Sequence, residues 1–133
     1  MKNPYTKLNT LKKINPTGLS EAGEREMPEY LKKKPGHKIL NVGSGNTRLI
    51  DNRIVHMDIF RYEVIDLIAD ASHLPFADRS FDAIFCDAVL EHVKNPFQVV
   101  GEFSRVLKEE GYVSAGVPFL FPYHDVLDHY FNF

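Results

Sequence analysis

The chain has 133 residues, a length that fits a single domain. With 44% hydrophobic and 26% charged residues, its composition is that of a globular domain and excludes a disordered or fibrous chain. Sixteen basic against eighteen acidic residues give a net charge of -2, so the domain lacks the overall basic field that nucleic-acid-binding proteins use.

Cys86 is the single cysteine, which excludes an internal disulfide and zinc sites built from paired cysteines. We therefore expect a reducing, cytoplasmic setting. The amino-terminal region lacks the apolar core of a signal peptide, and no apolar run approaches the ~20 residues of a membrane-spanning helix. These features predict neither secretion nor a membrane partner.

The amino-terminal part of the chain divides into an arm and a helix. Residues 1–18 are polar and aperiodic, and we expect them to form an arm, with residues 19–133 forming the domain. Apolar residues at helical spacing begin after Ser20, and Pro35 ends the pattern. Because proline lacks a backbone N–H, Pro28 predicts a kink or a restart of this helix near Met27.

Five short apolar runs separated by turn residues follow the helix. They lack strict alternation of polar and apolar residues, which favours strands buried on both faces of a sheet. The predicted strands are residues 38–42, 54–57, 64–69, 81–86 and 112–117.

A second helix is predicted between the fourth and fifth strands, over residues 95–108. Asn95 can cap it, Pro96 suits its first turn, and Gly111 would supply the stop. Its predicted apolar stripe consists of Phe97, Val100, Phe103, Val106 and Leu107.

The first strand runs directly into the turn Gly43-Ser44-Gly45. Missing side chains let a ligand approach such a backbone closely, although a plain strand-exit turn would also use glycines. A dinucleotide-binding loop would carry a third glycine where Arg48 stands. Its acidic residue would follow about 20 residues later, whereas Asp58 follows Gly45 by only 13. The spacing therefore argues against a dinucleotide or nucleotide-sugar enzyme.

Two acidic residues stand at the carboxyl ends of predicted strands. Asp58 ends the second strand, where a carboxylate can accept two hydrogen bonds from a ribose diol. Asp70 ends the third strand and could accept from an adenine amino group. A helix cap or turn for Asp58, and a turn for Asp70, remain alternatives.

These motifs, in this order, resemble the class I S-adenosylmethionine-dependent methyltransferases, and more narrowly the small-molecule group called type 11. The resemblance covers about residues 39–133. It implies an α/β Rossmann-like three-layer sandwich with a mainly parallel sheet ordered 3-2-1-4-5. The last two strands of the family fold would be missing, and residues 46–53 are too few for its first helix. The motifs are Leu40–Gly45, Asp58, Asp70–Ala71, Leu74–Phe76, Ser80–Asp82 and Val89–Val93.

The resemblance also implies a set of residues that bind S-adenosylmethionine. Asp58 would bind the ribose, Asp70 with Ala71 would meet the adenine, and Asp87 would lie near the amino-acid or methyl-bearing end. The glycine turn would line the methionine portion. The full set is Gly43, Ser44, Gly45, Asp58, Ile59, Asp70, Ala71 and Asp87.

Histidines offer two further hypotheses. His92 could act as a general base, since imidazole titrates near neutrality, but a structural turn is the favoured interpretation because methyl transfer depends chiefly on positioning. In the resembled family the stretch with Tyr123 and His124 lies toward the substrate. A metal cluster of His124, Asp125, Asp128 and His129 matches no known ligand spacing, so we expect no metal.

The sequence thus predicts methyl transfer from S-adenosylmethionine to a small-molecule acceptor. The alternative is a non-catalytic cofactor-binding or interaction module. Because the predicted fifth strand would lie at a sheet edge beside an aromatic tail, we also expect a homo-oligomer formed through that strand and the tail.

Overall fold

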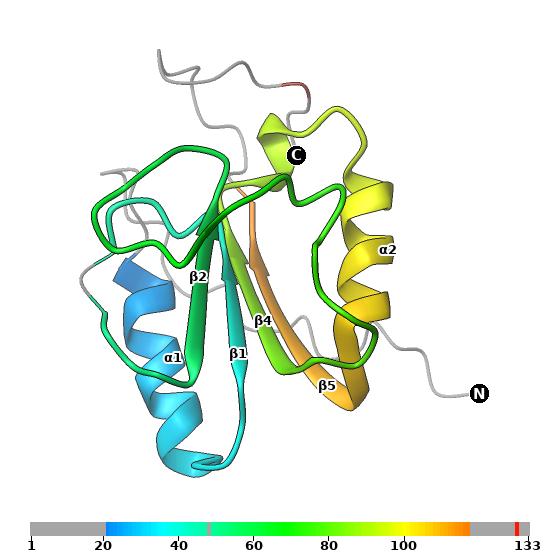
Figure 1. Cartoon of the computed structure of the whole chain (residues 1–133). Helices are drawn as coiled ribbons and strands as arrows, with labels where there is room; N and C mark the ends of the chain where they lie inside the picture. Colours follow the sequence, from blue (N-terminus) through cyan, green and yellow to red (C-terminus); the bar gives the residue numbers. More distant parts are fainter. Residues whose placement is uncertain (1–20, 48, 118–129, 131–133) are drawn as a thin grey trace.

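The computed structural model describes residues 21–47, 49–117 and 130 (Figure 1). Its strands form one parallel sheet in the predicted order, β3-β2-β1-β4-β5. The helices are α1 (Glu21–Lys33), the short 3-10 helix η1 (Leu90–His92) and α2 (Pro96–Val106). The strands are β1 (Ile39–Val42), β2 (Ile54–Asp58), β3 (Leu67–Ile68), β4 (Phe81–Asp87) and β5 (Leu107–Gly116).

The central strand β1 explains why the sequence lacks strict alternation. It pairs in parallel with β2 and β4, and all four of its residues are buried. Ile39 packs with Met27 and Leu31 of α1, whereas Leu40 packs with Phe103 and other residues of α2. Successive side chains of a strand point to opposite faces, so α1 and α2 cover opposite faces and complete three layers (Figure 1).

Helix α1 is continuous through Pro28, so the predicted restart near Met27 is wrong. Proline removes one helical hydrogen bond, but Met27 and Leu31 are one turn apart and both are buried against the sheet. This packing stabilises the helix on both sides of Pro28.

Helix α2 begins as the sequence predicts, but it buries a different stripe. The Asn95 side chain accepts a hydrogen bond from the Gln98 N–H at 3.2 Å, and Pro96 occupies the first turn. The buried residues are Val99, Phe103 and Val106, whereas Phe97 and Val100 are exposed. Both stripes contain Phe103 and Val106 at helical spacing, and the position of the sheet selects between them.

The end of α2 also differs from the prediction. The helix ends at Val106, β5 begins at Leu107, and Gly111 lies within β5 instead of ending the helix. The pairing of β5 with β4 is irregular before Tyr112, which marks a bulge. A Cβ atom on Gly111 would lie 2.8 Å from the Lys108 carbonyl oxygen, so the bulge requires glycine.

The third strand is only Leu67–Ile68, shorter than the predicted 64–69. Ahead of it, the Asp66 carboxylate accepts the His56 N–H at 2.8 Å, and the Asp66 N–H donates to the His56 carbonyl. A side chain thus replaces part of the expected strand pairing. Between β1 and β2 the described residues contain no helix, as the length of 46–53 predicted.

Two groups of predictions lie outside the described residues: the arm of residues 1–18, and Tyr123 and His124 with the possible metal cluster of the tail. Among the residues that are described, no helix has the length and apolar character to cross a membrane.

The corrected stripe of α2 leads to a prediction about stability. We expect Phe103→Ala to lower the free energy of unfolding by about 3 kcal/mol or more, because it leaves a cavity in the core. Phe97→Ala is the matched control on the same helix. Its side chain is 86% exposed, against 2% for Phe103, and its change should stay within about 0.5 kcal/mol. Urea unfolding of the two variants measures both, and equal losses would contradict the assignment.

Candidate functional site

The carboxyl ends of β1, β2 and β4 meet at one edge of the sheet, at the top of Figure 1. Three predicted site segments follow these strands: the turn Gly43–Gly45, the residues after Asp58, and Asp87. In open parallel sheets, ligands bind in the crevice outside these strand ends. The fold therefore brings the segments to the place where a ligand is expected.

The two glycines of the first turn have different surroundings. Both have positive φ angles, 67° at Gly43 and 54° at Gly45, which favour glycine. A Cβ atom on Gly43 would lie 2.1 Å from Cγ2 of Val89, so Val89 packs against the bare backbone there. A Cβ atom on Gly45 would meet nothing within 4 Å. A ligand can therefore approach the backbone at Gly45.

Asp58 connects the loops that follow β1 and β2. Its side chain accepts the Gly45 N–H at 2.9 Å through one carboxylate oxygen and the Phe60 N–H at 3.0 Å through the other. The residue is 8% exposed. A carboxylate has about four acceptor positions, and these bonds use two. The remaining capacity matches the two hydroxyl donors of a ribose.

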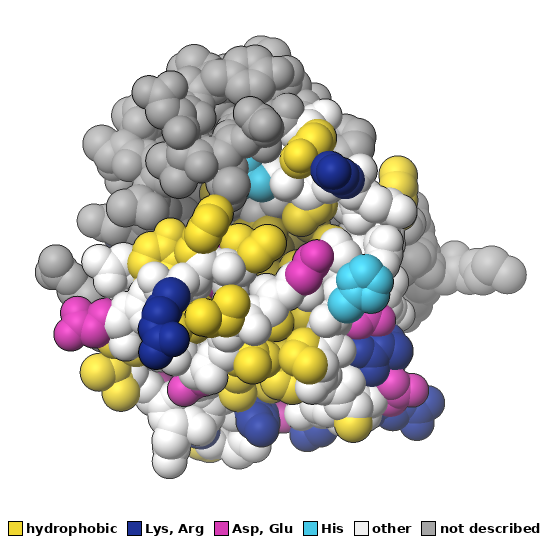
Figure 2. Space-filling view, turned by 45° about the horizontal axis from the view of Figure 1, so that its top comes forward, with side chains coloured by type: hydrophobic (Ala, Val, Ile, Leu, Met, Phe, Trp, Pro, Cys, Tyr) yellow, Lys and Arg dark blue, Asp and Glu magenta, His cyan; other side chains and the backbone are white. Residues whose placement is uncertain are grey.

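Exposed apolar side chains lie next to Asp58. Ile59 is 59% exposed, and Phe60 and Ile68 are also exposed although they are large hydrophobic residues. Figure 2 faces this edge of the molecule and shows hydrophobic side chains at its surface, with acidic, basic and histidine side chains around them. An apolar surface beside a carboxylate suits a ligand that combines a flat ring with a sugar.

Asp70 and Ala71 lie in a turn after β3. The Asp70 carboxylate accepts the Ser72 N–H at 2.8 Å, and its carbonyl accepts the His73 N–H at 3.0 Å. The Asp70 side chain is exposed, whereas Ala71 is buried in the core on the α2 side. Asp70 thus forms the turn that the alternative interpretation proposed, and its exposure leaves it accessible to a ligand.

Asp87 ends β4 directly beside Gly116 of β5. A Cβ atom on Gly116 would lie 1.9 Å from Asp87 Oδ1, so only glycine leaves room for this carboxylate. Burial raises the pKa of Asp87, and the negative charge of Glu26 on α1 raises it further. A hydrogen bond from the Ala88 N–H lowers the pKa of Asp87, against these two effects. The position of Asp87 therefore disfavours the charged form of its side chain.

Sequence reasoning missed a further acidic residue near this edge, Glu91, which it quoted only as part of a motif. It lies in η1 and is only 1% exposed, and its Oε1 is 3.8 Å from Nε2 of His92. The His92 ring is largely buried, and its backbone N–H donates to the Val89 carbonyl at 2.9 Å. Within the quoted motif, Val89 packs on Gly43 and Glu91 is buried, so the motif closes the glycine turn from the β4 side.

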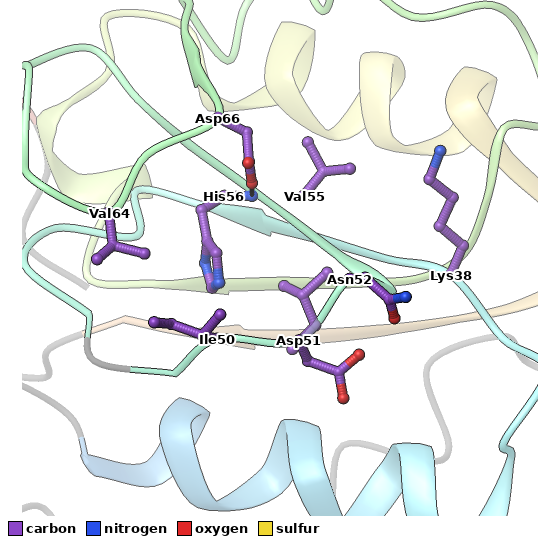
Figure 3. A pocket seen from close by; sticks show the side chains of 9 residues that line it. Lys38, Ile50, Asp51, Asn52, Val55, His56, Val64 and Asp66 are labelled. Carbon is purple, nitrogen blue, oxygen red and sulfur yellow. Dashed lines mark hydrogen bonds between the residues drawn. The ribbon is translucent and has the colours of Figure 1, made fainter.

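A hollow of about 410 Å³ lies beside β2, away from this edge (Figure 3). Asp51 and Asn52 precede the strand, and His56 and Asp66 are bonded to each other through the His56 backbone. None of the predicted cofactor-binding residues lines it. The hollow is thus separate from the candidate site. The described residues also contain no group of three His, Cys, Asp or Glu side chains that could hold a metal ion.

Comparison with known proteins shows the family to which the chain belongs. The family described as "Methyltransferase domain" matches residues 40–115. Methyltransferase GfsG of Streptomyces halstedii is 34% identical over 119 residues, which covers 70% of this chain and 43% of that protein. An uncharacterised protein of Methanocaldococcus jannaschii is 36% identical over 66 residues, covering 50% of this chain and 29% of the other. The chain therefore spans less than half the length of these two curated relatives.

Solved structures share the fold. The crystal structure of an S-adenosylmethionine-dependent methyltransferase from Aquifex aeolicus matches with a TM-score of 0.51 and 20% sequence identity, covering 77% of this chain and 72% of that one. The family match spans more than half of the chain, and it includes the glycine turn, Asp58 and Asp87. The chain therefore belongs to the methyltransferase domain family, in the class I, S-adenosylmethionine-dependent group called type 11.

Proposed function

We propose that this chain binds S-adenosylmethionine at the carboxyl edge of its sheet and transfers the methyl group to a small-molecule acceptor. The observation that carries the proposal is the geometry around Asp58. The carboxylate fixes Gly45, the open position of the glycine turn, and keeps acceptor capacity for a diol. The net charge of -2 and the type 11 resemblance favour a small acceptor.

Each predicted residue has a proposed role along the cofactor. Asp58 accepts from the ribose hydroxyls, and Ile59 supplies apolar surface beside them. Asp70 and Ala71 meet the adenine. Asp87, a partly buried carboxylate, faces the positively charged end. The methionine portion lies along Gly43, Ser44 and Gly45. Of the two glycines, Gly45 has the more open surroundings.

When bound, the cofactor supplies an electrophilic methyl group on a sulfonium. The acceptor would form the new bond to the methyl carbon with its own lone pair, and the electron pair of the broken carbon–sulfur bond would stay on the sulfur of the departing S-adenosylhomocysteine. The residues at the edge hold the cofactor for in-line attack. His92 is a candidate to take a proton from the acceptor, but its buried ring beside Glu91 favours a packing role.

A non-catalytic cofactor-binding module is the second candidate function. The proposed cofactor site is formed by the segments at the carboxyl ends of β1, β2, β3 and β4, and cofactor binding at these segments does not itself require methyl transfer. A turnover assay with a range of small nucleophiles distinguishes the two functions.

A reducing cellular setting is part of the same proposal. Cys86 is a free, buried thiol whose pKa is raised by burial, which suits a reducing cytoplasm.

The first test is binding of S-adenosylhomocysteine, measured by calorimetry. We expect wild-type protein to bind it and Asp58→Ala to weaken binding by roughly ten-fold or more, since lost charge-assisted hydrogen bonds cost ~1.5–3 kcal/mol. Asp51→Asn is the control, because it removes a carboxylate at the amino end of β2. Circular dichroism verifies folding. Absence of binding by folded wild-type protein would refute the cofactor site, and full affinity in Asp58→Ala would make Asp58 a turn residue only.

The second test uses the pH dependence of stability. The pKa of Asp87 is raised in the folded state, so the folded chain binds more protons than the unfolded chain. The chain therefore loses stability as the pH rises from the ordinary pKa of an aspartate through the raised one. Asp87→Asn removes this loss. We expect the variant to be at least as stable as wild type at pH 7, and the advantage to vanish at acid pH, while S-adenosylhomocysteine affinity falls. A variant that is destabilised at pH 7 but not in acid would contradict this assignment.

The third test concerns assembly. β5 lies at the edge of the described sheet and exposes Tyr112 and Val113, and Val117 directly after the strand is also exposed. We propose self-association through this strand and the tail. Sedimentation at several concentrations should show a mass that rises with concentration. A 15 kDa monomer throughout would refute it.

A further inference from the structure

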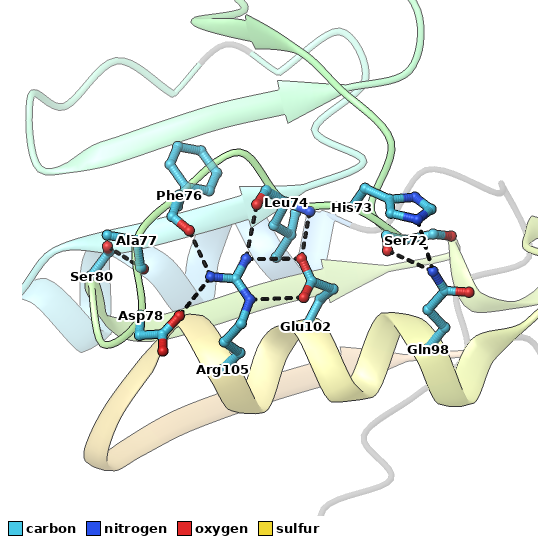
Figure 4. Close-up of polar contacts among 10 residues, drawn as sticks. All are labelled: Ser72, His73, Leu74, Phe76, Ala77, Asp78, Ser80, Gln98, Glu102 and Arg105. Carbon is cyan, nitrogen blue, oxygen red and sulfur yellow. Dashed lines mark hydrogen bonds and ion pairs between the residues drawn. The ribbon is translucent and has the colours of Figure 1, made fainter.

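The segment that carries Asp70 and Ala71 receives little support from the sheet. Residues 69–80 connect β3 to β4 without a helix or strand, and β3 itself has only two residues. A binding turn has to be held in place to recognise a ligand by hydrogen bonds. The segment is supported instead by helix α2, which runs alongside it (Figure 4).

Helix α2 has two parallel stripes of side chains, offset from each other by one residue position. Val99, Phe103 and Val106 face the core, whereas Gln98, Glu102 and Arg105 follow the same spacing one position earlier. Residues at this spacing lie on one face of a helix. The polar stripe therefore runs beside the buried one, along the connecting segment.

Arg105 binds the middle of the segment at three places. Its Nη2 donates to the Leu74 carbonyl at 2.9 Å, and its Nη1 donates to the Phe76 carbonyl at 2.7 Å and to Asp78 Oδ1 at 2.9 Å. The planar guanidinium directs these donors in fixed directions, so it sets the path of the backbone from Leu74 to Asp78.

Glu102 completes the arrangement. Its carboxylate accepts the Leu74 N–H at 2.7 Å and two donors of Arg105 at 2.8 and 2.9 Å. Hydrogen bonding to Arg105 lowers the pKa of Glu102 to about 2, so the carboxylate is ionised at any physiological pH. Leu74 is thus held through both its N–H and its carbonyl.

Gln98 extends the contacts toward the binding turn. Its amide nitrogen donates to the Ser72 carbonyl at 3.1 Å, and the Ser72 N–H donates to Asp70 Oδ1 at 2.8 Å. Ala71 and Leu74 are buried in the same cluster as Phe103. A continuous series of bonds therefore leads from α2 to the carboxylate of Asp70.

We propose that Glu102, Arg105 and Gln98 are positioning residues that set the Asp70–Ala71 turn for recognition of the adenine amino group. The inference rests on the proposed function, because it assumes that this turn meets adenine. A purely structural role would stabilise the fold without affecting which base is bound. Base selectivity therefore distinguishes the two roles.

The experiment compares two ligands by calorimetry: S-adenosylhomocysteine and its 6-deamino analogue, whose purine lacks the amino group. We expect wild-type protein to prefer the adenine ligand by about ten-fold, the value of one hydrogen bond to a charged group. Arg105→Lys keeps the charge but loses the fork of donors, so its preference should fall to about two-fold. Gln98→Ala should lose part of the preference, and its exposed position leaves the core intact.

Arg79→Lys is the matched control. Arg79 lies in the same segment, but its side chain forms an exposed ion pair with Glu109 at 3.3 Å, so the preference should be unchanged. Full preference in folded Arg105→Lys and Gln98→Ala would overturn the inference while leaving the proposed function intact, and so would wild-type protein that binds both ligands equally. If Arg105→Lys does not fold, Gln98→Ala decides alone. Absence of binding of either ligand by wild-type protein would refute the proposed function and this inference with it.

Discussion

The candidate site depends on the carboxylate of Asp58, which joins loops from two neighbouring strands. Parallel pairing of β1 with β2 brings Gly45 and Phe60 to the same edge, and Asp58 fixes both through their N–H groups. A neutral side chain would hold these loops less firmly, because hydrogen bonds to a charged acceptor are the stronger ones. The same group therefore organises the site and is available to a ligand.

Much of this arrangement follows from the sequence because the signals are local. The glycines after the buried run of β1 mark the end of that strand, and Asp58 marks the end of β2. Parallel strands place such ends together at one edge of the sheet. The features that sequence missed depend on distant contacts. Phe97 and Val99 both fit helical spacing, and only the position of the sheet decides that Val99 is buried. Gly111 suits a helix end or a bulge, and it lies in the stretch of β5 between Leu107 and Tyr112 where the pairing with β4 shifts register. Burial of Glu91 follows from the turn of η1, which apolar periodicity does not report.

The site concentrates groups that the fold holds at a cost. Asp87 carries its charge in a partly buried position near Glu26, and Glu91 is buried beside His92. Elsewhere the same residue types are placed favourably: the pKa of Asp51 is lowered to about 2 by its hydrogen bond to Arg53. A carboxylate whose pKa is raised by burial at a ligand-binding edge, as that of Asp87 is, is a candidate for a functional role. Asp87 lies at the carboxyl edge of the sheet and Asp51 before the amino end of β2, so the disfavoured charge lies at the candidate site and the favoured one lies away from it.

The short strand β3 has a consequence for the behaviour of the protein in a crowded solution. An exposed strand offers unpaired backbone groups to which another chain can add, and this is a common route to aggregation. Here the backbone of His56 is already occupied, since Asp66 accepts its N–H with a carboxylate and donates to its carbonyl. An incoming strand would have to displace a charged side chain to pair with β2 at that point. A single acidic residue therefore blocks intermolecular strand addition to β2 at His56.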